Sequence, residues 1–253
     1  MNSPALPLED ELRRIAASGF DFADVTLEPP GAWPVDGARL ARLLDELRLE
    51  AVGHTAYFLP IASPFDGVRE QALAAFEQAL DVAAEAGLEL VNVHPDPMTR
   101  LVARDEIRAR NAGSIARLAE AAASRGIVLA VENLGTRFGT VEDMEAVFEA
   151  VPDVRFHLDV GHANLVSPGA AAAYVHELLA RFADRLAHVH VSDNLGVDDL
   201  HLPLGAGAIE WPAVVRELKE AGWDGTVTLE IFSPDRAHLE TSRRLWLDWW
   251  AAV

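Results

Sequence analysis

The chain has 253 residues, half of them hydrophobic, and its 21 basic and 40 acidic residues give a net charge of −19 at pH 7. Such a surface repels phosphate backbones, so nucleic acid is not an expected partner. The absence of cysteine excludes disulfides and thiolate metal ligands. No apolar run approaches the ~20 residues of a membrane helix, and residues 1–7 lack a signal-peptide pattern. We therefore expect a cytoplasmic location.

Helical and strand periods alternate along the first half of the chain, and glycine and proline separate them. Leu12 and Ile15 lie on one stripe of the first helix, which Gly19 ends. The predicted helices of this half span residues 8–18, 36 or 37 to 47, 66–86 and 104–125, and the predicted strands span residues 20–28, 51–54, 88–94 and 127–132.

The same alternation continues with helices at 141–150, 170–183, 211–221 and 235–252 and strands at 154–159, 186–191 and 226–231. It predicts an α/β fold with a parallel sheet and helices outside it, best matched by a (β/α)8 TIM barrel. No linker divides the chain, so we expect a single domain over residues 1–253. Only seven strands are apparent, so either Met1 to Leu6 forms a degenerate first strand or that strand is missing.

The active site of such a barrel lies at the carboxyl ends of its strands. Each predicted strand can therefore be checked at its last two residues, and a histidine or carboxylate stands there in every one. In chain order the ends carry Glu28, His54, His94, Glu132, Asp159 with His162 just beyond it, His190 with Asp199 and His201 just beyond it, and Glu230.

The stretch from 186 to 207 gives the strongest signal for a metal. His188 and His190 alternate with valines and share one face of a strand, and the following loop carries Asp199 and His201 two residues apart. Imidazoles beside a carboxylate suit a borderline metal ion. The alternative interpretation is a polar strand end with scattered surface residues.

Burial sharpens this interpretation for Glu132 and Glu230, because each ends an apolar strand. A carboxylate buried there without a cation costs several kcal/mol, which a bound metal would remove. Among the other side chains we expect structural roles for His157 and His188, and Asp193 as an acceptor from a ligand imidazole. His54 or His94, taken alone, could be a core histidine or a loop anchor, and Glu28 is the weakest candidate and could simply cap the site.

The cluster exceeds the needs of one metal, so we expect one to three divalent ions. Without thiolates the choice falls on zinc or manganese, with cobalt and iron as alternatives and magnesium disfavoured by so many imidazoles. The predicted metal ligands are Glu132, Asp159, His190, Glu230, His54, His94, His162, Asp199 and His201.

These residues stand in an ordered set of motifs that resembles the xylose isomerase-like TIM-barrel superfamily, specifically its sugar phosphate isomerase/epimerase group. The motifs are Glu132-Asn133, the run from His157 to His162, the run from His188 to Asp193, the run from Asp199 to Gly207, and the run from Gly225 to Glu230. The resemblance implies that Glu132, Asp159, His190 and Glu230 bind a central metal. It also implies that Glu132 and Glu230 are catalytic and move protons.

The superfamily also contains endonuclease IV, a zinc enzyme that cuts DNA at abasic sites. Resemblance to it implies three metals, one held by His54, His94 and Glu132, a second by the central set, and a third by His162, Asp199 and His201. Tyr57-Phe58 falls where endonuclease IV inserts side chains into the duplex. Against this stand the acidic charge and few basic loops. Against a free ketohexose stands the lack of the arginine that ketose epimerases carry shortly after the His190 position.

The sequence therefore favours a divalent-metal-dependent isomerase or epimerase of a sugar, sugar phosphate or polyol ketone, by proton transfer next to a carbonyl. The alternatives are an endonuclease IV-like multinuclear zinc phosphodiesterase and a non-catalytic metal- or sugar-binding barrel. The expected partner is a small sugar or polyol, without a membrane. Trp246, Trp249 and Trp250 form a stripe on the last helix that we interpret as barrel packing, with a homo-oligomer surface as the alternative.

Overall fold

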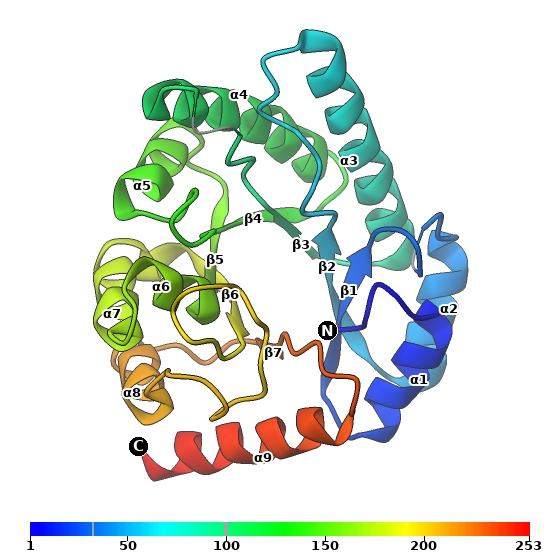
Figure 1. Cartoon of the computed structure of the whole chain (residues 1–253). Coiled ribbons are helices and arrows are strands. Elements are labelled where there is room, and N and C mark those ends of the chain that lie inside the picture. The colour runs from blue at the N-terminus through cyan, green and yellow to red at the C-terminus, as the bar shows by residue number, and fades with distance from the viewer. Residues whose placement is uncertain (32, 99–100) are drawn as a thin grey trace. The chain divides into compact units, whose positions relative to one another are not determined.

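The computed structural model describes residues 1–31, 33–98 and 101–253, in which seven strands alternate with helices (Figure 1). The chain divides into two compact units. The first holds residues 1–131 and 145–155, and the second holds residues 132–144 and 156–253. That residues 1–253 form a single domain stays a prediction.

In the first unit β1 (Phe22–Leu27), β2 (Glu50–Thr55), β3 (Leu90–Val93) and β4 (Val128–Glu132) pair in parallel and in chain order. The register sets Thr26 beside His54 and His54 beside Asn92. Parallel strands in register end at one edge of the sheet, so polar residues that close successive strands come together there. The last residue of β4, Glu132, belongs to the second unit.

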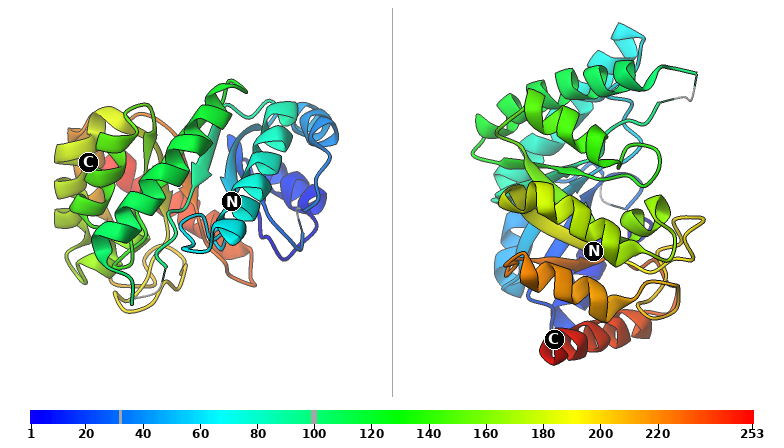
Figure 2. Two further views of the ribbon diagram at one scale, coloured as in Figure 1. Left: turned by 90° about the horizontal axis from the view of Figure 1, so that it is seen from above. Right: turned by 90° about the vertical axis from the view of Figure 1, so that its left-hand side faces the viewer.

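The helices that cover this sheet are α1 (Leu8–Ala17), α2 (Gly37–Leu47), α3 (Asp66–Ala86) and α4 (Arg104–Ala123). Asp36 caps α2 by accepting a hydrogen bond from the Arg39 N–H at 2.8 Å. Gly87 ends α3 in the left-handed conformation with φ of 76°. Helix α3 packs between α2 and α4, as Figures 1 and 2 show. α5 (Val141–Ala150) crosses the boundary between the two units.

Residues 1–6 are described and contain no strand, so the alternative of a degenerate first strand is wrong. Asn2 instead covers the free edge of β1. Its backbone N–H donates to Asp24 O at 3.2 Å, and its side-chain oxygen accepts from the Thr26 N–H at 2.8 Å. The backbone and side chain of Asn2 thus pair two backbone groups at this edge, which a strand interrupted by Pro4 and Pro7 could not pair in full.

In the second unit β5 (Arg155–Asp159, from Phe156 on), β6 (Leu186–Val191) and β7 (Val227–Leu229) pair in parallel, with Asp159 beside His190 and Val191 beside Leu229. β7 is shorter than predicted, so Glu230 stands just past its end, where its N–H donates to Val191 O at 3.1 Å. A helix that the sequence did not predict, α6 (Val160–Val166), begins directly after β5.

The other helices of this unit are α7 (Ala171–Phe182), α8 (Trp211–Glu220) and α9 (Ala237–Ala252). Trp249 of α9 stacks on Trp211 of α8 with ring centroids 6.2 Å apart, and Trp246 meets Trp211 edge to face. This confirms that the tryptophan stripe packs against its own chain. Within the part of the chain that the structure describes, none of the helices has the length and apolar character of a membrane span.

Candidate metal centre

The centre begins where β4 and β5 end, at Glu132 and Asp159. The side chain of Asn133 joins these two ends, because its Nδ2 donates to Asp159 O and its Oδ1 accepts from the Asp159 N–H, both at 2.9 Å. The amide extends the backbone ladder by one step after β4 has stopped. It therefore fixes the two backbone positions from which the buried carboxylate side chains extend. The sequence pointed to this residue only through the Glu132-Asn133 motif.

Helix α6 places His162 against these carboxylates. Asp159 is the N-cap of the helix, and its Oδ1 accepts from the His162 N–H at 2.5 Å. Nδ1 of the His162 ring then lies 3.1 Å from Glu132 Oε1 and 3.5 Å from Asp159 Oδ1. Gly161 is required in this turn, because a Cβ there would lie 2.6 Å from Ser192 Oγ. One strand end thus supplies both a carboxylate and an imidazole.

His190 and Glu230 come from the ends of β6 and β7. Nδ1 of His190 lies 2.9 Å from Glu230 Oε2 and 4.0 Å from Asp159 Oδ2. Both side chains are buried, with the imidazole fully enclosed. Nδ1 is therefore the nitrogen of His190 that faces the carboxylates.

The loop after β6 completes the arrangement through Asp199 and His201. Asp199 Oδ2 lies 3.0 Å from His162 Nε2 and 3.1 Å from His201 Nε2, while His201 Nδ1 lies 3.8 Å from Glu230 Oε2. Imidazoles and carboxylates thus alternate around a closed circuit, which we call the acid–imidazole ring. Its members are Asp159, His162, Asp199, His201, Glu230 and His190, and Glu132 joins it through His162.

Without a cation the charges of this ring perturb one another strongly. Burial raises the pKa of Asp159 to about 7, with the carboxylates of Glu132 and Glu230 adding to the shift against the attraction of His162. Burial alone would lower the pKa of His162, but Asp159, Asp199 and Glu132 outweigh it and raise that pKa well above its ordinary value. The electrostatic potential at His162 is therefore negative.

The pKa values of the carboxylates on the loop side of the ring shift in the opposite direction, downward. Burial opposes ionisation of Asp199 and Glu230, but nearby imidazoles outweigh it. His162 and His201 lower the pKa of Asp199. His190 and His201 lower the pKa of Glu230 to about 2. Burial would likewise lower the pKa of His201, yet Glu230 and Asp199 raise it to about 9. Protons on His162 and His201 thus supply positive charge that a bound divalent cation would supply instead.

The residues of the centre fit a divalent metal ion. Asp159 Oδ2 is buried and has no hydrogen-bond partner in the described residues, which is costly for a carboxylate that lacks a cation. One donor atom each from Glu132, Asp159 and His162 lie within 4.8 Å of one another. Oxygen and imidazole donors of this kind suit zinc, manganese, cobalt or iron.

Two further predicted ligands, His54 and His94, lie together in the first unit. Their Nε2 atoms are 3.1 Å apart and their rings meet edge to face. His54 is buried at the end of β2, and Glu28, the weakest candidate, is also buried, just after β1. Two imidazole nitrogens at this distance can share a proton or serve one metal ion. Their role as ligands stays a prediction.

The two histidines predicted to be structural differ in what they touch. His188 has its nitrogens next to hydroxyls, 2.6 Å from Thr226 Oγ1 and 3.0 Å from Thr228 Oγ1, as a structural histidine would. Nδ1 of buried His157 lies 3.3 Å from Glu132 Oε2. Sequence reasoning missed this contact, because it depends on a side chain of the neighbouring strand.

Asp193 corrects one expectation. We predicted that it accepts from a ligand imidazole, but its carboxylate accepts from the N–H groups of Gly205 (2.9 Å) and Ile209 (3.3 Å) and from Trp211 Nε1 (2.9 Å). It therefore anchors the loop that carries Asp199 and His201. Gly207 is required here, since a Cβ would lie 2.2 Å from Asp193 Oδ1.

Comparison with known proteins places this geometry in context. A family model described as "Xylose isomerase-like TIM barrel" matches residues 12–251. The chain is 31% identical over 233 residues to uncharacterized protein MJ1311 of Methanocaldococcus jannaschii (88% of this chain, 78% of the relative). It is 28% identical over 257 residues to the L-ribulose 3-epimerase of Methylomonas sp. (93% and 82%). A solved D-tagatose 3-epimerase-like protein superposes with a TM-score of 0.87 at 27% identity (98% and 94%). The predicted TIM-barrel fold is thereby confirmed.

Proposed function

Because the chain belongs to the xylose isomerase-like TIM-barrel family, we propose that it is a divalent-metal-dependent epimerase or isomerase of a sugar, sugar phosphate or polyol ketone. The observation that carries this proposal is the set of buried carboxylates held by imidazoles in the acid–imidazole ring, with Glu132 beside it. The similarity to the L-ribulose 3-epimerase of Methylomonas sp. supports the same class of reaction.

Glu132, Asp159, His190 and Glu230 would hold the central metal ion, for which zinc or manganese is our first choice and cobalt or iron the second. When bound, such an ion polarises the carbonyl and adjacent hydroxyl of the substrate and acidifies the C–H bond between them. His162, Asp199 and His201, and separately His54 and His94, are the proposed ligands of further ions. We therefore propose one to three ions per chain.

Glu230 and Glu132 carry the proton in this proposal. Glu230 removes a proton from the carbon next to the carbonyl, and Glu132, in its protonated form, donates a different proton, on the opposite face for an epimerase or to the neighbouring carbon for an isomerase. Nδ1 of His190 lies 2.9 Å from Glu230 Oε2, and Nδ1 of His157 lies 3.3 Å from Glu132 Oε2. Both bases are buried.

The second candidate function is an endonuclease IV-like phosphodiesterase. It is favoured by the completeness of its ligand set in this sequence, in which all nine predicted ligand positions carry histidine or carboxylate. The net charge of −19 opposes it, because duplex binding depends on neutralising phosphates. The third alternative, a non-catalytic metal- or sugar-binding barrel, is opposed by the similarity to sugar epimerases.

The proposal is tested by solvent deuterium exchange. The protein is loaded with zinc or manganese in D2O and incubated with a panel of ketoses and polyol ketones, with and without phosphate, and the C–H signals next to the carbonyl are followed by NMR. We expect metal-dependent loss of one such signal together with the appearance of the epimer or isomer. Absence of exchange across the panel from protein with a full metal complement would contradict the proposed reaction.

A further inference from the structure

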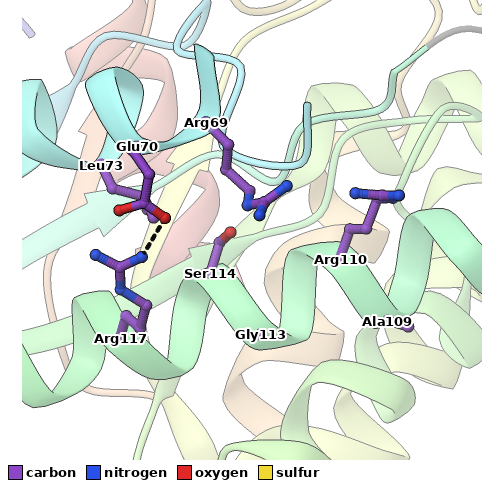
Figure 3. Close-up of a pocket in the computed structure, with 8 residues that line it drawn as sticks. All are labelled: Arg69, Glu70, Leu73, Ala109, Arg110, Gly113, Ser114 and Arg117. Atoms are coloured by element: carbon purple, nitrogen blue, oxygen red, sulfur yellow. Dashed lines mark hydrogen bonds and ion pairs between the residues drawn. The ribbon is translucent and has the colours of Figure 1, made fainter. Parts of the chain in front are cut away.

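A cavity of about 330 Å3 lies between α3 and α4, within the first unit and outside the candidate metal centre (Figure 3). Arg69 reaches into it from α3, and Arg110 and Arg117 reach it from α4, whereas Glu70 supplies the one carboxylate among its lining residues. In a chain with nearly twice as many acidic as basic residues, three guanidinium groups gather at this one cavity.

Ion pairs hold these arginines in place at the edges of the cavity. Arg117 Nη1 pairs with Glu70 Oε1 at 2.7 Å and joins the two helices at one end. Arg69 donates to Ser63 O at 2.8 Å and to Asp66 at 2.7 Å, and Arg110 Nε donates to Glu106 at 2.9 Å. Within the described residues these contacts use only some of the five N–H donors of each guanidinium.

The partner carboxylates are exposed, which limits how strongly they neutralise the arginines. The side chain of Asp66 is 83% exposed and that of Glu106 is 50% exposed. Exposed ion pairs of this kind contribute little to stability, so a dianion in the cavity can compete with them. Preorganised guanidinium groups bind phosphate well, because their N–H donors match its oxygens in pairs.

Gly113 gives an independent indication that the cavity is kept open. It lies inside α4, where glycine is less favourable than alanine. Packing does not require this glycine, since no atom outside the helix backbone lies within 4 Å of where its Cβ would be. It lines the cavity between Arg110 and Arg117, and any longer side chain there would enter the space that the arginines surround.

We propose that this cavity binds the phosphate group of a small phosphorylated compound, at a site separate from the candidate metal centre. Arg69 and Arg110 contact the phosphate oxygens from opposite helices, and Arg117, fixed by Glu70, closes one end. The cavity volume falls at the lower end of ~300–1,000 Å3 for small-ligand pockets, which suits a phosphate with a small organic part. The hydroxyl of Ser114 donates to Ile61 O, so the arginines supply the contacts to the anion.

The test is a titration with inorganic phosphate and pyrophosphate by isothermal calorimetry at constant ionic strength. The wild type should bind at least one of them saturably, with a Kd of about 1 mM or tighter. Arg69→Gln and Arg110→Gln should each weaken binding at least about tenfold, or ~1.4 kcal/mol. Arg13→Gln, which removes an exposed arginine of α1 paired with Glu9, is the matched control and should bind as the wild type does.

Gly113→Met separates this proposal from phosphate binding elsewhere, including binding at a metal. It fills the cavity without removing a charge and improves the helix, so it should fold at least as well as the wild type and lose binding. Gly113→Ala should keep binding. Undiminished binding by Gly113→Met, or no saturable binding by the wild type, would overturn the proposal.

Discussion

Nδ1 of His190 lies 2.9 Å from Glu230 Oε2 and 4.0 Å from Asp159 Oδ2. One imidazole at the end of β6 thus faces a carboxylate on each side of it, one from β5 and one from just after β7. Nδ1 is therefore the atom through which His190 faces both carboxylates. These three side chains would together serve as ligands of one divalent ion.

Asp159→Asn is expected to lower the metal affinity at least about tenfold. The same change should raise the free energy of unfolding of the metal-free protein, because it removes a buried charge whose pKa is raised to about 7 by burial and by neighbouring carboxylates. Elemental analysis after dialysis and urea denaturation in chelator measure the two effects. Asp248→Asn, at an exposed position of α9, is the control, and equal metal content in Asp159→Asn and wild type would remove Asp159 from the ligand set.

Glu230→Gln should retain much of the metal, because the amide keeps a ligating oxygen, and should exchange little deuterium into an accepted ketose. Glu132→Gln should block the return of the proton, so exchange next to the carbonyl would persist more than formation of the epimer or isomer. NMR of both signals, with metal content measured on the same samples, distinguishes the variants. If Glu230→Gln keeps its metal and exchanges at the wild-type rate, Glu230 is a ligand only.

Asp193→Asn is expected to lower the free energy of unfolding by about 2–4 kcal/mol, because the carboxylate accepts from several buried N–H groups and hydrogen bonds to a charged acceptor are worth about 1.5–3 kcal/mol. The Trp211 indole, 2.9 Å from Asp193 Oδ2, reports the change through its fluorescence. Asp198→Asn in the exposed loop is the control. Wild-type stability in Asp193→Asn would show that the loop does not depend on this anchor.

Tyr174 gives a pH dependence outside the metal centre. Burial, with the charges of Glu177 and Glu142, raises its pKa from 10.0 to about 12, and its hydroxyl donates to Gly139 O at 2.9 Å. A raised pKa means that the folded state holds the proton more tightly. The stabilisation is therefore fully present below pH 10 and is lost as the pH rises through 12.

Tyr174→Phe should therefore cost about 1 kcal/mol at pH 8 and less at pH 11.5. Urea denaturation at both values measures this difference. The absorbance at 295 nm of wild type minus variant isolates the ionisation of Tyr174, which should show a midpoint near 12. A midpoint near 10 would contradict the burial argument.

Affinity for duplex DNA should be weak, because the net charge of −19 repels the backbone. A fluorescence titration with an abasic duplex, at moderate ionic strength and in the presence of zinc, measures it. An abasic duplex that is bound tightly, or cleaved in a way that chelation abolishes, would favour the phosphodiesterase over the epimerase.

The strand ends show how far sequence reasoning reaches. The alternation of apolar strands with amphipathic helices predicts parallel strands, and parallel strands bring their last residues to one edge. That rule was enough to select Asp159 and His190, which the register sets side by side, and to select Glu230 beyond the next strand. It could not show α6, because a seven-residue helix capped by Asp159 has too few turns for a periodic signal.

The sequence by itself determined the class of fold and the chemical types of the site residues, because periodicity and residue identity are local properties. Only the tertiary structure decided which atoms meet. It put His162 between Glu132 and Asp199, gave Asp193 to the loop backbone rather than to an imidazole, and used Asn133 to join two strand ends. Such contacts depend on side-chain directions across neighbouring strands and loops, and a difference of one rotamer or one residue of loop path exchanges one partner for another.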